Sequence, residues 1–241
     1  MGDLLNSLMN SNLAIVGAGL LGGLLGLAFS YKEIVKIIRI LRTQTGVIGA
    51  VNQISADEYF ETTGKAESGM SLQSPITKNP CVLWSVTVME KRGSGKNSRW
   101  VTVFYRTSTE PFYLTDGTGK LTVDPSQPME LILREDVKKS SGVFSSLDEE
   151  TEGALSSLGV DTKGFLNFNK NMRIHERYIE RGDDIYVIGR KTYGDSVGDT
   201  PWIVSDHSEQ QLLGKFLWQV VGKVFLGTLF GAFIVFVLQN R

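Results

Sequence analysis

Two long apolar runs frame the pattern of polar and apolar positions along this chain. The first extends from Leu13 to Phe29, and the second extends from Val224 to Leu238, with Phe216 to Gly222 lengthening it backwards. A helix needs about 17 to 25 apolar residues to cross a bilayer. The pattern therefore predicts transmembrane helices at residues 13–30 and 216–238, with short tails at 1–12 and 239–241.

Two other interpretations compete for the first run. A secretory signal peptide requires Lys or Arg before its apolar core, whereas residues 1–12 contain Asp3 and no basic side chain. A buried helix of a soluble protein can be equally apolar. The second run, near the other end of the sequence, makes two membrane spans the favoured interpretation.

A basic helix is predicted directly after the first run, at residues 31–45. Its cations recur every three or four residues, while Ile34, Ile37 and Ile38 fall on the opposite side. We expect one continuous helix that leaves the membrane and ends near Gly46, which can supply a left-handed cap. The cations expected to contact lipid headgroups are Lys32, Lys36, Arg39 and Arg42.

The second span is expected to begin with a lead-in helix at residues 208–215. Ser208 is the predicted N-cap, with Gln211 three residues further on. Lys223 interrupts the apolar run. Its ammonium is expected to extend to the headgroup level, a depth that also suits Trp218.

The charges beside the two spans predict their orientation. Lys and Arg collect on the cytoplasmic side of membrane helices. Four cations closely follow the first span, and Lys215 and Lys223 stand at the start of the second, whereas the outer flanks hold only Asp3, the amino terminus and Arg241. We expect an integral membrane protein with two spans, its middle part in the cytoplasm and both termini outside.

Residues 46–207 alternate between apolar and polar positions in the manner of short β-strands. The clearest alternation is Cys81 to Lys91, where Val82, Trp84, Val86 and Val88 share one face. Turn residues separate the strands and predict two hairpins, one turning at 93–96 and one at 116–119. Other strands are predicted at 59–67, 100–106, 112–114, 121–123, 129–133, 173–180, 185–191 and 202–204, and Val47 to Ile54 is a weak strand or the run-in to one.

These strands predict a mainly β soluble domain between the two transmembrane α-helices. Its size suits one domain with one core, as a small antiparallel barrel or sandwich. Residues 137–171 are rich in Ser, Gly and acidic side chains and form a predicted excursion that packs lightly and is mobile. Within it, Ser146 and Glu149 form a capping-box pattern for a helix from Leu147 to Leu158, closed by Gly159.

The composition narrows the classes of function. The formal net charge is −1, from 25 Lys and Arg against 26 Asp and Glu, so nucleic acid is not the favoured partner. Binding of single strands would need a basic groove with stacking aromatic residues. The single cysteine, Cys81, forms no disulfide within the chain. No structural zinc site or haem attachment motif can be assembled, and no cofactor is expected.

Each potential catalytic group has a more ordinary interpretation. Cys81 could act with His175, but its place in an alternating strand favours a small buried side chain. The segment 93–96 contains Gly and Lys but lacks the spacing of a phosphate-binding loop, so it is predicted to be a turn. Asp195 and Asp199 lack the ligand spacing of a calcium loop. We therefore expect no catalytic and no metal site.

Glycines within the two predicted spans are spaced four residues apart. Small residues at this spacing form a groove that lets two helices approach closely. The contact could join the two spans of one chain, or it could join two chains in a homo-oligomer; glycine is also common in membrane helices without any such contact. The three pairs are Gly19 with Gly23, Gly22 with Gly26, and Gly227 with Gly231.

Three segments carry a resemblance to a known family. They are SPITKNPCVLWSVTV, FYLTDGTGKLTVDP and ERYIERGDDIYVIG, in this order between the two spans. Together they resemble the beside-membrane domain of the GIDE/MULAN-type mitochondrial ubiquitin ligases and their prokaryotic relatives, over roughly residues 13–238. The positions that carry the resemblance are Ser74, Pro75, Pro80, Cys81, Asp116, Gly119, Gly182 and Asp183.

The resemblance implies a RING finger after the second span in the eukaryotic members, and here the chain departs from the pattern. A RING needs eight Cys or His ligands, and the sequence holds Cys81, His175 and His207. We therefore expect no ubiquitin transfer by this chain alone. Two functions remain open. The first is a noncatalytic membrane-anchored scaffold that binds a membrane or cytoplasmic protein, and the second is a component of a ubiquitin ligase system with a separate catalytic subunit.

Overall fold

A computed structural model describes residues 2–55, 58–68, 70, 72–126, 129–142, 144–164, 168–191 and 197–239. The chain divides into two compact units. The helical unit combines Met1–Thr43 with Glu209–Arg241, and the β-rich unit is Gln44–Ser208. The prediction of a β-rich part between two long apolar helices is confirmed.

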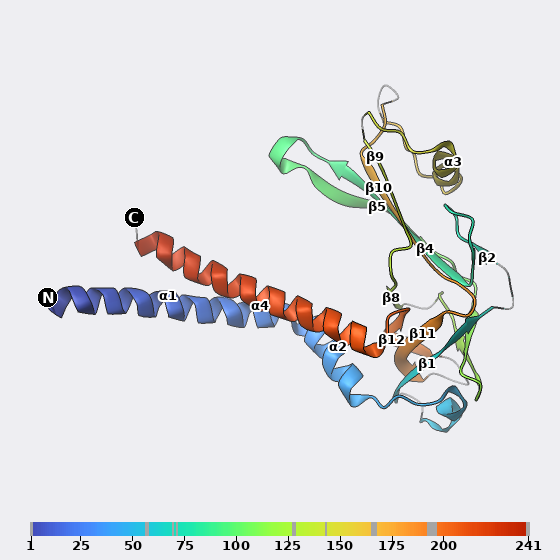
Figure 1. The fold of residues 1–241 in the computed structure, drawn as a ribbon, viewed down its shortest axis with the longest axis horizontal. Helices are drawn as coiled ribbons and strands as arrows, with labels where there is room; N and C mark the ends of the chain where they lie inside the picture. Colours follow the sequence, from blue (N-terminus) through green and yellow to red (C-terminus); the bar gives the residue numbers. More distant parts are fainter. Residues whose placement is uncertain are drawn as a thin grey trace. The chain divides into compact units, whose positions relative to one another are not determined.

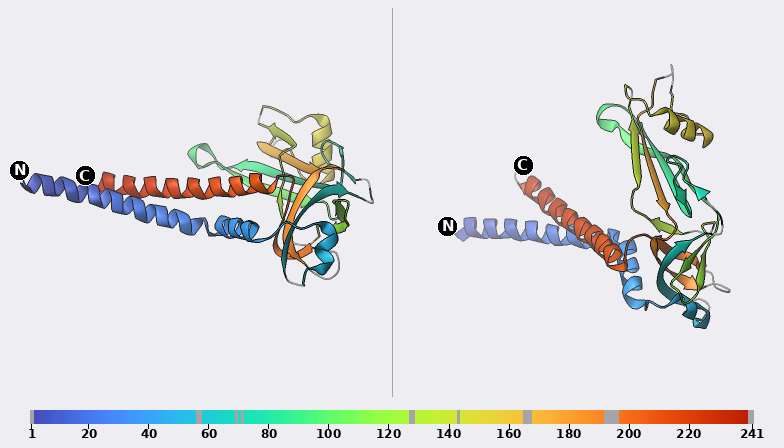
Figure 2. Two further views of the ribbon diagram at one scale, coloured as in Figure 1. Left: turned by 60° about the horizontal axis from the view of Figure 1, so that its bottom comes forward. Right: turned by 45° about the vertical axis from the view of Figure 1, so that its right-hand side comes forward.

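The helical unit contains α1 (Gly2–Phe29), α2 (Tyr31–Arg42) and α4 (Glu209–Gln239). Figures 1 and 2 show α1 and α4 side by side. Two stretches, Asn12–Phe29 and Glu209–Gln239, are long and apolar enough to cross a membrane. In their most apolar 18 residues, only 17% of the first and 6% of the second is buried, which argues against two core helices of a soluble protein.

The junction after α1 differs from the continuous helix that the sequence predicts. The helix is interrupted at Ser30, which precedes α2 and whose hydroxyl donates to the carbonyl oxygen of Gly26 at 2.8 Å. The end of α2 differs too. It stops at Arg42 with Thr43 in an extended conformation (φ −89°, ψ 129°), so the predicted left-handed cap at Gly46 is wrong. The start of α4 agrees with the prediction, since Glu209 directly follows Ser208.

In the described part of the chain, the β-rich unit holds three sheets. A six-stranded sheet has the order β7-β6-β1-β11-β12-β8, and a four-stranded sheet has the order β5-β4-β10-β9. The first is built from β1 (Tyr59–Glu67), β6 (Phe112–Thr115), β7 (Lys120–Val123), β8 (Glu130–Ile132), β11 (Asp184–Lys191) and β12 (Val197–Ser205). The second is built from β4 (Leu83–Arg92), β5 (Arg99–Thr107), β9 (Val137–Ser141) and β10 (Met172–Ile179), and a third small sheet pairs β2 (Leu72–Gln73) with β3 (Pro80–Cys81).

Both predicted hairpins are confirmed. Strand β4 pairs with β5 around the 3₁₀ turn η2 (Gly95–Asn97), and β6 pairs with β7. The sheets are not wholly antiparallel, however, because β12 pairs with β8 in parallel. Of the two alternatives for Val47 to Ile54, the weak strand is wrong, because Ile48–Gln53 forms the 3₁₀ helix η1, and the run-in agrees with the structure, because η1 precedes β1. The single strand predicted at Cys81 to Lys91 is interrupted at Val82, so that Cys81 belongs to β3.

The unit has two hydrophobic clusters rather than the one core expected. The first is formed mainly by side chains of the six-stranded sheet. It also includes Val82, Leu83 and Ile179, which lie at one end of β4 and β10. The second lies on the four-stranded sheet and includes Val86 and Val88 from the other end of β4. Strands β4 and β10 therefore each contribute to both clusters, β10 through Ile179 in the first and through Met172 and Ile174 in the second.

The segment 137–171 is more closely integrated than predicted. Residues Val137–Ser141 pair with β10 as an edge strand. The helix α3 (Glu149–Ser157) buries Ala154 and Leu155 in the second cluster, so light packing is wrong. Its N-cap is Asp148 rather than Ser146, because the Asp148 carboxylate accepts from the backbone N–H of Thr151 at 2.9 Å. Gly159 ends it as predicted, with φ +79°.

Candidate binding pocket

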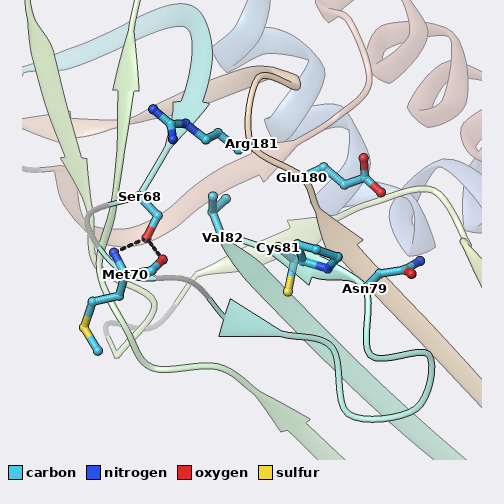
Figure 3. A pocket seen from close by; sticks show the side chains of 8 residues that line it. Ser68, Met70, Asn79, Cys81, Val82, Glu180 and Arg181 are labelled. Atoms are coloured by element: carbon cyan, nitrogen blue, oxygen red, sulfur yellow. Dashed lines mark hydrogen bonds between the residues drawn. The ribbon is translucent and has the colours of Figure 1, made fainter.

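A pocket of about 510 Å³ lies where two of the three segments singled out in the sequence meet. Its walls come from the end of β1, from β3 with its neighbours, and from the β10–β11 turn (Figure 3). The residues that line this Cys81 pocket are Ser68, Met70, Asn79, Pro80, Cys81, Val82, Glu180 and Arg181. The third segment, at the β6–β7 turn, does not contribute to it.

The loop that leads into the pocket is held by a buried carboxylate. Glu176 on β10 is fully buried and accepts from the backbone N–H groups of Ile76 (2.7 Å) and Thr77 (3.1 Å), and from the Thr77 hydroxyl (2.6 Å). A buried charge is tolerated when hydrogen bonds satisfy it. Glu176 therefore fixes the loop before Pro80, a role that the sequence alone does not reveal.

Two of the resemblance positions shape this loop. Ser74 is buried; its Oγ pairs with the Thr77 hydroxyl and accepts from the backbone N–H of Asn79 at 3.1 Å. Pro75 follows it, and the Asn79 side chain donates to the Tyr178 hydroxyl at 2.6 Å. The loop is thus tied both to itself and to β10.

The opposite wall is a turn tied to β1. The backbone N–H of Gly182 donates to the carbonyl of Ala66 at 2.8 Å, and the N–H of Ala66 donates to the carbonyl of Asp183 at 2.9 Å. The Asp183 carboxylate also accepts from the N–H of Glu180 at 2.8 Å. Gly182 has φ +94°, which glycine adopts without strain. These bonds hold Glu180 and Arg181 at the pocket.

Cys81 is a poor nucleophile in this position. Its side chain is 5% exposed, and burial, together with the nearby Glu176 and Glu180 carboxylates, raises the pKa of its thiol to about 12. His175 is not beside it. It pairs with Thr87 on β4, four residues along β10 from Ile179 and hence roughly 13 Å further up the strand. Its imidazole contacts Glu135 instead.

Another set resembles a catalytic triad by residue type only. Ser205, Asp206 and His207 lie together at the end of β12, and Nδ1 of His207 is 2.8 Å from Asp206 and 3.4 Å from the Ser205 hydroxyl. A triad needs one imidazole nitrogen on the carboxylate and the other on the nucleophile. Here the same nitrogen faces both, and Ser205 is fully buried with its hydroxyl donating to Ile132. The cluster therefore has a structural role.

The resemblance positions Asp116 and Gly119 lie at the β6–β7 turn and hold η1. The Asp116 carboxylate accepts from the N–H of Ile48 at 2.8 Å, and the Thr118 hydroxyl accepts from the N–H of Gly49 at 2.9 Å. A side chain at Gly119 would press on the Gly49 backbone, about 3.0 Å away. This turn is structural, and it explains why η1 replaces a strand.

The glycines of the two apolar helices lie between α1 and α4 of the same chain. A Cβ at Gly22 would overlap the carbonyl of Gly227, and one at Gly231 would overlap the carbonyl of Ala18. A Cβ at Gly26 would lie 2.6 Å from the carbonyl oxygen of Lys223. The pairing of 18 with 231, and of 26 with 223, makes the two helices antiparallel. Gly19 and Gly23 both face Thr228, with Gly19 at ordinary contact distance.

The cations after the first apolar helix have mixed surroundings. Lys32 and Arg42 are exposed, while Lys36 lies 5.2 Å from the ring centre of Phe216. Arg39 accepts at its carbonyl from the N–H and the hydroxyl of Thr43. Lys223, expected at the headgroup level, forms an ion pair with Glu33 at 2.9 Å, a contact that hydropathy alone cannot reveal.

Within the described residues, no group of three or more His, Cys, Asp or Glu side chains could hold a metal ion. Asp195 lies outside those residues, and Asp199 lies in β12. The segment 93–96 is part of the β4–β5 turn, as predicted, with Gly93 at φ +91°.

Comparisons of this chain with known protein families, with curated proteins and with solved structures found no match.

Proposed function

We propose that this chain is a membrane-anchored, noncatalytic interaction module whose Cys81 pocket binds a segment of a partner protein. The observation that carries the proposal is the convergence of two separate segments on one pocket whose walls are held by hydrogen bonds and whose single thiol, Cys81, is a poor nucleophile. A rigid, hydrogen-bonded wall suits recognition, because little ordering is needed when the partner binds.

The chemistry of the pocket favours a peptide segment. Met70 and Pro80 are exposed and offer apolar contacts, while Glu180 and Arg181 offer one anion and one cation. Pockets of a few hundred Å³ with apolar walls and a few polar groups suit one or two side chains of a partner. Arg181 is suited to a carboxylate on that partner, since its guanidinium can form paired hydrogen bonds.

The anchoring part of the proposal rests on the two apolar helices. They are the length of membrane spans and are largely exposed. Carbonate washing of membranes should leave the intact chain in the pellet, and detergent should release it. Release by carbonate or high salt without detergent would contradict anchoring.

The cytoplasmic placement of the β-rich unit is part of this proposal and follows from the flanking cations. Asn97 is exposed at the β4–β5 turn and is a suitable site for a label. In a Cys81→Ala background, Asn97→Cys should resist an impermeant maleimide in intact cells and react after permeabilisation. Labelling in intact cells would reverse the orientation.

The pocket is tested by photo-crosslinking in native membranes. A photoreactive residue at Met70 should crosslink a defined partner, whereas one at the exposed Lys120, on β7, should not. Arg181→Glu should reduce the Met70 crosslink about tenfold if the cation contacts a partner carboxylate. Equal crosslinking from both positions, or none from Met70, would contradict the pocket as the binding site.

The second candidate is a component of a ubiquitin ligase system. The observation that favours it is that two of the three GIDE/MULAN-like segments form the pocket. The sequence has too few Cys and His residues for a RING, so a separate subunit would have to supply catalysis. A RING protein or a ubiquitin-conjugating enzyme as the Met70 crosslink would support this candidate over a general scaffold.

A further inference from the structure

We propose that the outer face of the four-stranded sheet, together with the β4–β5 turn, docks onto an anionic bilayer surface. The inference rests on the proposed membrane anchoring but concerns a different surface from the Cys81 pocket. It assigns a lipid partner to the exposed cations and aromatic side chains of this face.

The register of the sheet identifies this face. Met172, Ile174, Val86 and Val88 point into the second hydrophobic cluster, which α3 also joins. Side chains alternate across a strand, so their sequence neighbours point to the other side. The outer face therefore comprises Lys91, Trp100, Tyr105, Lys138, Arg173 and Arg177 among its large side chains.

This outer face is strongly basic. Among the described strand residues that alternate onto it, none is Asp or Glu. Within the described residues, Lys91 and Lys138 form no ion pair, and both are exposed. One acid beside this face is Glu135, which contacts His175. The His175 hydrogen bond, together with the charges of His175, Lys138 and Arg177, keeps the pKa of Glu135 below its ordinary value.

The turn at the end of β4 adds further positive charge. Residues 91–99 contain four cations and no acid, and Lys96 and Arg99 are exposed. Of these four cations, Arg92 forms an ion pair with Glu90 at 3.2 Å, which neutralises its charge. In Figure 1 the β4–β5 hairpin extends beyond the neighbouring strands of its sheet, so the turn is an accessible projection.

Aromatic side chains accompany the cations. Trp100 is half-buried, with the Arg173 guanidinium 4.0 Å from its ring centre, and Tyr105 is 61% exposed. Trp and Tyr prefer the headgroup level of a bilayer, where one part of the ring is apolar and another is hydrated. Lys and Arg near an anionic leaflet each strengthen attachment about fivefold.

Two observations favour a bilayer over single-stranded nucleic acid as the occupant. Protein sheets that bind single-stranded nucleic acid present open aromatic rings on which the bases stack. Here Arg173 already covers one face of the Trp100 ring. The β-rich unit is also joined at both ends, at Thr43–Gln44 and Ser208–Glu209, directly to the unit that holds the two apolar helices. A bilayer would therefore always be at high local concentration.

The test uses the full chain in lipid nanodiscs, with an environment-sensitive fluorophore on Asn97→Cys in a Cys81→Ala background. Discs with about 30% phosphatidylserine are compared with pure phosphatidylcholine discs. In the anionic discs we expect a blue-shifted fluorophore that brominated lipid quenches. The shift should disappear in about 0.5 M salt, which screens exposed charges.

Charge reversal makes the test specific. The double variant Lys91→Glu/Lys138→Glu should lower the equilibrium constant for docking at least about 25-fold, from two cations at about fivefold each. The matched control Lys120→Glu reverses an exposed cation on β7, outside this face, and should leave the signal unchanged. Circular dichroism of each variant shows whether the fold is retained.

Three outcomes would overturn the proposal. One is an identical fluorophore signal in anionic and neutral discs. Another is an equal effect of Lys120→Glu and of the double variant. The third is tight binding of a labelled oligothymidine at physiological salt that the double variant abolishes, which would assign the face to nucleic acid. Carbonate resistance of the same chain is measured separately, so failure of docking is distinguishable from failure of anchoring.

Discussion

The ammonium of Lys223 lies 2.9 Å from the carboxylate of Glu33, although 190 positions separate the two residues along the chain. Lys223 also donates to the carbonyl of Phe29 at 3.2 Å. It thereby joins α4 to the end of α1 and the start of α2, on either side of the interruption at Ser30. The hydrogen bond from Lys223 keeps the pKa of Glu33 below its ordinary value, so the Glu33 carboxyl group is charged at neutral pH.

Removing one partner of this pair should cost more stability than removing both. The Glu33 side chain is only 18% exposed, so Lys223→Met leaves a poorly solvated carboxylate. We expect Lys223→Met to lower the unfolding free energy by roughly 1–3 kcal/mol, between the values for exposed and buried pairs. Glu33→Gln/Lys223→Met should recover part of that loss. Thermal unfolding in detergent completes the double-mutant cycle; additive effects would show that the pair does not couple.

The antiparallel pairing of α1 with α4 can be locked by a disulfide. A Cβ at Gly19 would lie 3.8 Å from the Cβ of Ala232, within the range that disulfides require. In a Cys81→Ala background, Gly19→Cys/Ala232→Cys should oxidise within one chain and migrate as a monomer. The control Gly17→Cys/Ala232→Cys should not, because none of the described residues of α4 lies within 4 Å of a Cβ at Gly17. A disulfide-linked dimer as the main product would indicate contact between chains.

Cys81 should be almost inert in the folded protein. Raising the pKa of a thiol from 9.0 to about 12 lowers its thiolate fraction at neutral pH about a thousandfold, and the thiolate is the reactive form. Iodoacetamide should therefore label the chain slowly under native conditions and rapidly after unfolding. Asn97→Cys, whose residue is exposed, serves as the reactive control. Rapid native labelling of Cys81 would contradict a buried, neutral thiol.

Glu176→Gln should loosen the loop that forms one wall of the pocket. The Glu176 carboxylate accepts three hydrogen bonds with two oxygens, whereas an amide has one oxygen and would turn its NH₂ toward other donors. We expect a loss of roughly 2–4 kcal/mol, measured by denaturant unfolding. Hydrogen exchange should become faster at Ile76 and Thr77. Unchanged exchange there would show that Glu176 does not hold the loop.

Asp116→Asn should destabilise η1 in a pH-dependent manner. Burial works to raise the pKa of Asp116, but hydrogen bonds from Thr118 and from the backbone of Ile48 outweigh it and hold the pKa below its ordinary 3.8. A carboxyl with a lowered folded pKa stabilises the protein above 3.8, and this contribution disappears as the pH falls through the folded value. We expect the variant to lose about 1 kcal/mol at neutral pH. The difference in Tm from the unaltered protein should shrink below pH 3.8, and a constant difference would contradict the role.

The local pattern was sufficient where neighbouring residues decide the structure. The bounds of β1 agree with the prediction, and the two hairpins follow from turn residues such as Gly93 that allow positive φ. The N-cap of α3 shows the limit of this reasoning. Ser146 and Asp148 are both capping residues, and the cap is Asp148, whose carboxylate also pairs with Lys139 on the neighbouring strand β9.

The candidate pocket could not be predicted, because its walls come from parts of the chain about 100 residues apart. The sequence identified Pro80 and Gly182 only through resemblance, and it predicted a buried Cys81 without bringing the three together. Their meeting depends on Ile179 pairing with Leu83 and on Gly182 bonding to Ala66. The local repeat of apolar and polar positions, from which strands are predicted, does not specify such long-range pairings.

The sequence by itself determined two apolar helices of membrane-spanning length and a β-rich part between them, because apolar length and alternation are local properties. Only the tertiary structure decided that β4 serves two hydrophobic clusters, that Glu176 holds the pocket loop, and that Lys223 faces Glu33. It also decided that cations from separate strands gather on one face. Each of these is a contact between distant residues, and packing of the whole chain selects which of the many compatible partners actually meet.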